Sequence, residues 1–514
     1  MTSANDTYQP SKTVLQASRT NIGRLFRSIA EQDPTAIAII EHDKKITYGE
    51  LNDRVNKLAN GLTDKGLKHG DRVAVIARNC SAFLELELAC AKTGAILVSL
   101  NWRLVKEEVT HCLNLTQPKL VFATIEFQEL LPNSNETENI LFHTEYENLL
   151  NNSSNKEPVN TVDAEDGLVI IFTSGTTGLP KGALISHRAL ITRALIFTTE
   201  TRAPKNDTFI AWTPLFHMGS NDFSIATLLH GGQVVIIDGY QPEEIIKTIE
   251  MYSVHYLTVV PGMIEDFINQ LKLSNAKPKP IGLIGAMADL VPRSMLKEIT
   301  ILLDAPYFNT FGSTETGNPP ASGNLIPIGT APEVLSKKQN NFCEIRLVDP
   351  NGNDVKDGEP GELAIRGPSL FSGYWANEEA NAEAFRNGWF HMGDVFRRTP
   401  EGLLNFVDRV KYMIKSGGEN IYPAEIEQHI MADDRIIDVA VVRKPDERWG
   451  EVPVAFVASN SDEIKSIDII DLCRDRISKY KLPKEVYFMK SDEIPRSTSG
   501  KIQRHILEQR LINK

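Results

Sequence analysis

Short runs of continuous apolar residues, separated by segments of helical spacing, dominate the first half of the chain. A strand that is apolar at every position is buried on both faces, which is typical of parallel sheets covered by helices. The chain is therefore predicted to be an α/β protein of layered, largely parallel sheets. The predicted strands are residues 73–77, 96–99, 119–123, 168–173, 233–237 and 256–260, and the first predicted helices are residues 22–31, 47–65 and 81–93.

The last third of the chain has a different pattern of strand and turn residues. After about residue 341, turn residues break up short strand patterns, which predicts a β-rich subdomain. Residues 412–514 could form a small α+β unit, with helix patterns near 424–431, 466–478 and 500–511. We therefore predict an N-terminal domain of residues 1–410 and a C-terminal domain of residues 411–514. The polar stretch 132–165 is expected to be an excursion on the surface.

Charge and cysteine content exclude several classes of protein. Lys and Arg number 55 against 67 Asp and Glu, a net charge of −12, so nucleic acid and anionic membrane surfaces are poor partners. The five cysteines form no CxxC pair, which favours a reducing compartment over a disulfide framework or a zinc site. The first residues lack the apolar core of a signal peptide, and no apolar stretch reaches the ~20 residues of a membrane helix. The cytoplasm is the expected location.

A loop rich in Gly, Ser and Thr follows the apolar strand 168–172 and precedes a helix expected near Ser186. Glycines let successive backbone N–H groups converge on an anion, hydroxyls add donors, and Lys181 adds a positive charge for phosphate oxygens. The loop is not a Walker A motif, because Leu179 and Pro180 separate Gly178 from Lys181. By local chemistry alone, a flexible surface loop is the alternative. The predicted phosphate-binding residues are Thr173, Ser174, Gly175, Thr176, Thr177, Gly178 and Lys181.

The string 173–182 resembles the phosphate-binding loop of the adenylate-forming superfamily, which includes acyl- and aryl-CoA synthetases, luciferases and nonribosomal-peptide adenylation domains. Further stretches resemble the same superfamily in the same order, from about residue 20 to 510. The resemblance implies an N-terminal adenylation domain that binds ATP and the acyl group. It also implies that the small C-terminal α+β domain is mobile and carries a catalytic lysine.

The segment 311–316 resembles a second motif of this superfamily. By that match Phe311 is an aromatic partner for adenine, Thr314 contacts phosphate and Glu315 binds Mg²⁺ through its carboxylate. Taken alone, the string would be a turn with a solvated Glu. The nucleotide site is also expected to include Gly285, Ala286, Gly312 and Ser313.

Three later motifs extend the resemblance. Asp394, in the segment 389–394, matches the Asp that accepts hydrogen bonds from the ribose hydroxyls, and Arg409 matches a ribose- and phosphate-binding Arg. Lys411 falls at the hinge between the two domains. The resemblance places Lys415, Gly417 and Gly418 in a loop that lines the channel for the thiol, and Lys501 at the position of the catalytic lysine, which stabilises charge in the transition state.

The predicted acyl pocket is formed by the windows 216–223, 285–288 and 310–317, none of which contains Lys or Arg. A second substrate carboxylate would lack a partner there, so a mono-carboxylic acid with an apolar tail is predicted. Fatty acid metabolism is one such context. The residues assigned to the pocket are His217, Met218, Gly219, Met287 and Gly317.

The predicted reaction is activation of a carboxylic acid with ATP and Mg²⁺, giving an acyl-adenylate and pyrophosphate, followed by transfer of the acyl group to coenzyme A. The closest alternative is an amide ligase that passes the acyl group to an amine or amino acid. A luciferase-type oxygenase and a non-catalytic nucleotide-binding protein are further alternatives; retention of both Glu315 and Lys501 argues against the last. Relatives occur as monomers and dimers, so a homodimer is one expectation.

Overall fold

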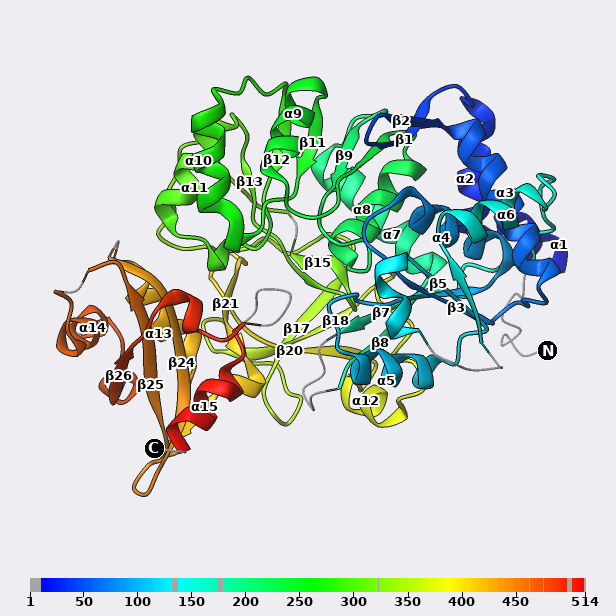
Figure 1. The fold of residues 1–514 in the computed structure, drawn as a ribbon. Helices are drawn as coiled ribbons and strands as arrows, with labels where there is room; N and C mark the ends of the chain where they lie inside the picture. The colour runs from blue at the N-terminus through cyan, green and yellow to red at the C-terminus, as the bar shows by residue number, and fades with distance from the viewer. Residues whose placement is uncertain are drawn as a thin grey trace, which may run out of the picture.

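The computed structural model describes residues 11–131, 137–173, 179–321, 323–433, 435–461, 463–474, 476–496 and 502–512. Figure 1 shows a large N-terminal part, coloured blue to yellow, with a smaller orange-to-red C-terminal part at its side. Two sheets form the frame of the N-terminal part. Among the described residues, no helix is long and apolar enough to cross a membrane.

The first sheet has six strands in the order β6-β5-β3-β4-β7-β8, and all its neighbours are parallel except β7 and β8. It confirms the predicted strands at 73–77, 96–99, 119–123 and 168–173 to within a residue or two. The short strand β8 was not predicted, because the loop was expected to lead directly into a helix. The strands are β3 (Arg72–Ile76), β4 (Ile96–Ser99), β5 (Leu120–Ala123), β6 (Glu138–Leu141), β7 (Gly167–Thr173) and β8 (Lys181–Ser186).

The second sheet has eight strands in the order β16-β13-β12-β11-β9-β10-β1-β2, parallel throughout its centre and antiparallel at both ends. The strand predicted at 256–260 is β11 (Val254–Leu257), which begins two residues earlier. The others are β1 (Ile37–Glu41), β2 (Lys44–Thr47), β9 (Thr208–Ala211), β10 (Gln233–Ile236), β12 (Ile281–Ile284), β13 (Tyr307–Phe308) and β16 (Leu325–Ile326).

One hydrophobic core joins the two sheets through helices that pack between them. The three predicted N-terminal helices are confirmed, and the capping box of Thr47 and Glu50 defines where one of them begins. The helix α7 begins directly after Ser186, where a helix was predicted to start, and the Ser186 side chain caps it. The helices of this part are α1 (Lys12–Ser18), α2 (Ile22–Gln32), α3 (Tyr48–Asp64), α4 (Ser81–Thr93), α5 (Lys106–Thr116), α6 (Thr144–Asn151), α7 (His187–Thr201), α8 (Met218–Leu229), α9 (Pro242–Met251), α10 (Ile264–Ser274), α11 (Arg293–Leu302) and α12 (Glu378–Ala384).

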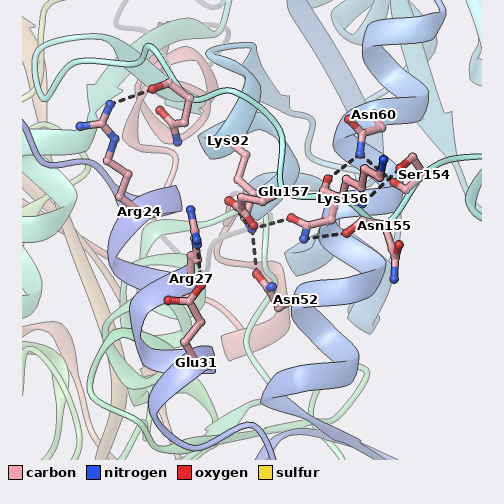
Figure 2. A network of polar contacts seen from close by, with 12 residues as sticks. Arg24, Arg27, Glu31, Asn52, Asn60, Lys92, Ser154, Asn155, Lys156 and Glu157 are labelled. Carbon is pink, nitrogen blue, oxygen red and sulfur yellow. Dashed lines mark hydrogen bonds and ion pairs between the residues drawn. The ribbon is translucent and has the colours of Figure 1, made fainter.

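The expectation that residues 132–165 form a surface excursion is only partly right: the described residues lie mostly at the surface, but part of the segment is regular structure. Strand β6 extends the six-stranded sheet, and α6 follows it directly. Further along, Glu157 forms an ion pair with Lys92, whose ammonium is fully buried and also donates to Asn52 (Figure 2). The same ammonium donates to Asn56. The segment is therefore held by specific polar contacts, which its composition did not reveal because Asn, Ser and Glu are also typical of surface loops.

The predicted β-rich subdomain is confirmed as a five-stranded antiparallel sheet, preceded by the hairpin β14–β15. Because β20 and β21 pair along their length, the subdomain holds Asp394 opposite Arg409. The strands are β14 (Phe311–Ser313), β15 (Gly317–Ala321), β17 (Glu344–Val348), β18 (Gly361–Arg366), β19 (Phe385–Arg386), β20 (Trp389–Arg398) and β21 (Leu404–Arg409).

The C-terminal part is a separate five-stranded sheet with helices, as predicted. It adjoins the β-rich subdomain through Asp408, whose carboxylate accepts a hydrogen bond from the backbone N–H of Ala424 at the start of α13. The helix predicted at 466–478 ends at Cys473, because Arg474 adopts an extended conformation. The elements are β22 (Ile414–Ser416), β23 (Glu419–Ile421), α13 (Pro423–Ile430), β24 (Ile436–Asp446), β25 (Gly450–Ser459), α14 (Ser466–Cys473), β26 (Glu485–Phe488) and α15 (Arg504–Ile512).

Candidate active site

The predicted phosphate loop connects the antiparallel neighbours β7 and β8. Thr173 ends β7 and pairs with Lys181, which begins β8, so the two ends of the loop lie side by side. The ammonium of Lys181 lies 5.5 Å from the centre of the Tyr374 ring, within cation–π range. The remaining loop residues of the prediction, Ser174, Gly175, Thr176, Thr177 and Gly178, lie outside the described residues.

Glu315 lies in the turn between β14 and β15. One oxygen of its carboxylate, Oε1, accepts a hydrogen bond of 2.9 Å from the Tyr374 hydroxyl, and its backbone carbonyl accepts one of 2.8 Å from the N–H of Phe371. The turn itself is closed by Thr316, whose hydroxyl accepts from the N–H of Ser313. Lys181 and Glu315 are thus brought together around one tyrosine, although they lie far apart in sequence.

A buried guanidinium fixes the same turn from the other side. Arg193 of α7, only 4% exposed, donates to the backbone carbonyls of Thr314 and Ser369 and forms an ion pair of 3.0 Å with Asp222 of α8. Gly317 is in left-handed conformation, and a Cβ there would lie 2.7 Å from Cδ of Arg193. The aliphatic part of Arg193 therefore packs directly on the glycine.

The sequence did not point to Arg193, and the position of this residue corrects the predicted acyl pocket. The acyl-pocket windows contain no Lys or Arg, but the fold brings this guanidinium against one of them. The available signal was Arg193 within the mostly apolar middle of α7, together with a single Asp in the mostly apolar α8. Burial raises the pKa of Asp222, and the neighbouring Arg193 opposes that shift.

Asp394 and Arg409 form the third part of the site. The Asp394 side chain is almost fully buried, and its Oδ1 lies 2.9 Å from Nε of Arg409 on the paired strand. The Asp394 carboxylate is the main cause of a raised pKa of Arg409, and the Glu315 carboxylate also contributes. The positive charge of Arg409 therefore lies within the field of both carboxylates.

Phe311 packs in the core of the β-rich subdomain, against β20 and β21, the strands that carry Asp394 and Arg409. It is 5% exposed, and its ring centre lies 4.8 Å from that of Phe396 and 5.3 Å from that of Phe406. Its neighbour Gly312 has no room for a side chain, since a Cβ would meet the carbonyl oxygen of Gly317. Contact between Phe311 and adenine stays a prediction.

The turn 285–287 follows β12 and packs on Tyr307. Gly285 has φ +86°, and a Cβ there would lie 2.2 Å from the Tyr307 ring, so only glycine fits. The Tyr307 hydroxyl donates to the carbonyl of Ala286, and Met287 has a positive φ of 48°. The backbone geometry therefore explains the small residues Gly285 and Ala286, and this explanation does not depend on which ligand the turn contacts.

The predicted pocket residues 217–219 begin α8. The exposed His217 caps the helix, with its Nδ1 accepting from the N–H of Gly219 at 3.2 Å. Beneath the helix, Asn221 donates to the fully buried Glu87, and burial raises the pKa of that carboxyl to about 8. This buried carboxyl was also missed, because α4 carries both Glu and Lys, and charged helix residues usually lie at the surface.

The predicted thiol-channel residues belong to the C-terminal sheet. Lys415 lies in β22, and Gly417 and Gly418 form the turn to β23; the N–H of Gly417 donates to the carbonyl of Trp449. Both glycines have positive φ, and a Cβ on Gly417 would lie 2.7 Å from the Trp449 ring. Lys501 lies outside the described residues.

The described residues contain no group of three or more His, Cys, Asp or Glu side chains that could hold a metal ion. Mg²⁺ prefers oxygen ligands and keeps several waters, so it is often bound by one or two carboxylates together with phosphate oxygens. The single carboxylate of Glu315, oriented by a hydroxyl, fits that mode of binding.

Comparison with known proteins identifies the family of the chain. The family model of AMP-binding enzymes matches residues 26–375, and that of the AMP-binding enzyme C-terminal domain matches residues 425–501. A feruloyl-CoA synthase from Amycolatopsis is 33% identical over 483 residues, covering 92% of this chain and 95% of the relative.

Two solved structures are also similar. A Mycobacterium tuberculosis fatty acyl CoA synthetase has a TM-score of 0.77 at 28% identity, covering 95% of this chain and 98% of that one. The o-succinylbenzoate CoA synthetase of Bacillus subtilis, in complex with ATP and magnesium ion, has a TM-score of 0.81 at 25% identity, covering 94% and 98%.

The chain belongs to the AMP-binding enzymes, with a large mixed α/β N-terminal domain and a small C-terminal domain. Within them it is an AMP-forming acid–CoA ligase, which activates a carboxylic acid as an acyl-adenylate and transfers the acyl group to coenzyme A. The predicted reaction and its use of ATP, Mg²⁺ and coenzyme A are confirmed at this level, and the amide-ligase alternative is not supported.

Proposed function

We propose that this ligase activates a mono-carboxylic acid with an apolar or aromatic body. The observation that carries this proposal is the ion pair of Arg193 with Asp222. The fold brings this guanidinium to the predicted acyl windows, but a buried carboxylate already neutralises it, so it offers little to a second substrate carboxylate. The related feruloyl-CoA synthase is named for an aromatic acid.

The proposed roles in adenylate formation follow from charge. A carboxylate must attack the α-phosphate of ATP, and two anions approach each other only if the protein neutralises them. Lys181 and the rest of the loop 173–182 hold the outer phosphates, and Glu315 holds Mg²⁺, which would neutralise charge on the phosphate oxygens. Asp394 accepts hydrogen bonds from the ribose hydroxyls, with Arg409 beside it.

Two proposed roles belong to the C-terminal part. The ammonium of Lys501 bridges the attacking carboxylate and the α-phosphate as charge develops between them. After pyrophosphate leaves, the domain of residues 411–514 rotates about Lys411, which withdraws Lys501 and presents the turn of Lys415, Gly417 and Gly418 to the thiol. Fatty acid metabolism and a cytoplasmic location stay predictions.

A panel of acids tests the proposed substrate class. Release of AMP with coenzyme A present is measured for ferulate, straight-chain fatty acids of increasing length, and dicarboxylates of matched size. We expect the highest kcat/KM for a mono-carboxylic acid. A dicarboxylate preferred by tenfold or more would contradict the proposal.

Lys501→Ala tests the catalytic assignment. We expect acid-dependent exchange of pyrophosphate into ATP to fall by at least ~100-fold, with nucleotide binding largely retained. Lys484→Ala, which removes an exposed lysine of the same domain, is the matched control and should keep the native rate.

A further inference from the structure

Tyr374 connects two predicted ATP-binding residues that come from different elements. Its hydroxyl donates to Oε1 of Glu315 at 2.9 Å, and the face of its ring lies 5.5 Å from the ammonium of Lys181. The two carboxylate oxygens of Glu315 are therefore not equivalent, because one of them is held by the tyrosine.

The backbone around Tyr374 is fixed on both sides of the site. Tyr374 bridges to Ala183 of β8, and the neighbouring N–H of Trp375 donates to the carbonyl of Gly182. On the other side, Asn381 of α12 both accepts from the N–H of Tyr374 and donates to its carbonyl. The tyrosine thus sits on a rigid segment attached to the strand that begins with Lys181.

We propose that Tyr374 is a positioning residue, which orients the Glu315 carboxylate for Mg²⁺ bound to ATP without touching the reacting atoms. This inference rests on the proposed role of Glu315 as the metal ligand. A hydrogen-bond donor on one oxygen fixes the rotation of the carboxylate and directs its other lone pairs to the cation. The ring also limits where the Lys181 ammonium can lie.

The hydroxyl of Tyr374 is the donor in its hydrogen bond to Glu315. Burial, and then the charge of Glu315, raise the pKa of Tyr374 well above its usual value. Arg409 lies close enough to oppose that shift. The positioning role of Tyr374 is inferred from its contacts with Glu315 and Lys181, and not from its pKa.

Tyr374→Phe removes the hydroxyl and keeps the ring, its contact with Phe371 and its cation–π contact. Outer partners of metal ligands typically contribute 10–100-fold to metal affinity. We expect the Mg²⁺ concentration that gives half-maximal binding of an α,β-methylene ATP analogue, measured by calorimetry, to rise about tenfold. Binding of the same analogue in EDTA should change by less than about twofold.

The matched control is Tyr487→Phe, which removes a hydroxyl that donates to Glu485 on the C-terminal sheet. It should leave the Mg²⁺ dependence unchanged. In a Glu315→Gln background, Tyr374→Phe should have no further effect on Mg²⁺, because the hydroxyl acts through that carboxylate. Glu315→Asp, which withdraws the carboxylate from the hydroxyl, should also raise the Mg²⁺ concentration needed for half-maximal binding and serves if Tyr374→Phe does not fold.

The outcomes separate this inference from the proposed function. If Glu315→Gln raises the Mg²⁺ requirement and Tyr374→Phe does not, the metal assignment stands and the positioning role is overturned. Equal loss of binding with and without Mg²⁺ in Tyr374→Phe would show a structural role only. If Glu315→Gln leaves the Mg²⁺ requirement unchanged, both the metal assignment and the positioning role fail.

Discussion

The guanidinium of Arg193 and the carboxylate of Asp222 form an ion pair of 3.0 Å between α7 and α8, with side chains only 4% and 8% exposed. The same guanidinium holds the carbonyl of Thr314, so a contact inside the helical layer defines the position of the turn that carries Glu315. The packing of two helices is thereby coupled to the geometry of the proposed metal site.

Replacing Arg193 by Met should destabilise the protein by about 3–5 kcal/mol, because Asp222 would stay buried without its partner. Urea denaturation of the variant measures this cost. The double variant Arg193→Met/Asp222→Leu should recover part of it, since no unpaired charge remains. Arg435→Met, which breaks an exposed pair with Asp433, should cost under about 1 kcal/mol; a similar loss in both single variants would contradict the argument.

Lys92→Met should also cost about 3–5 kcal/mol, since it leaves the acceptors on Asn52, Asn56 and Glu157 without their donor (Figure 2). The loss should appear as a lower midpoint of thermal unfolding. Lys65→Met removes a partly exposed pair with Glu138 in the same region and should change the midpoint little. Equal midpoints for the two variants would show that the network of Lys92 contributes no special stability.

The stability of the fold should decline as the pH falls from about 6.5 to about 4, in part because of His187. Burial lowers the pKa of this histidine to about 4, and its Nδ1 accepts a hydrogen bond from the N–H of Ile22. Between those pH values the unfolded chain binds the proton and the folded chain does not, so acid favours unfolding, by up to about 3 kcal/mol.

His187→Asn tests this contribution, because its amide oxygen can accept the same hydrogen bond and does not titrate. The slope of unfolding free energy against pH should be shallower than in the unmodified protein between pH 4.5 and 6.5. His42→Asn, at an exposed turn, serves as the control and should retain the native slope. Identical slopes in all three proteins would rule out the contribution.

Gly285→Ala should damage the turn that carries Ala286 and Met287, because the added Cβ meets the buried Tyr307 ring. We expect a lower midpoint of thermal unfolding and, where the protein folds, a higher KM for the acid. Gly239→Ala is the matched control: its φ is +83°, close to that of Gly285, but no atom lies within 4 Å. Gly239→Ala should show only the backbone strain of about 1 kcal/mol. If both variants lose the same stability, the clash with Tyr307 is excluded as the cause.

Much of the fold was predictable because buried parallel strands are apolar at every position. The strands β3, β4, β5 and β7 were found in this way; α3 was found from its helical spacing, and the start of α7 was expected near Ser186. Strands β6 and β8 were not, because one lies in a polar stretch and the other follows the glycine-rich loop. Local pattern carries information on burial and periodicity; β6 shows little of either, and the apolar run of β8 is too short to separate a strand from the start of the helix that follows.

The sequence by itself determined the class of the protein, since its motifs occur in a recognisable order, and it determined which residues to examine as candidates. It also identified Asp394 and Arg409 separately. Only the tertiary structure decided that these two residues form an ion pair, that Arg193 fixes the turn of Thr314, and that Tyr374 holds Glu315. Ion pairs and hydrogen bonds depend on distances of about 3 Å between residues that here lie 15 to 121 positions apart, and no local pattern specifies such distances.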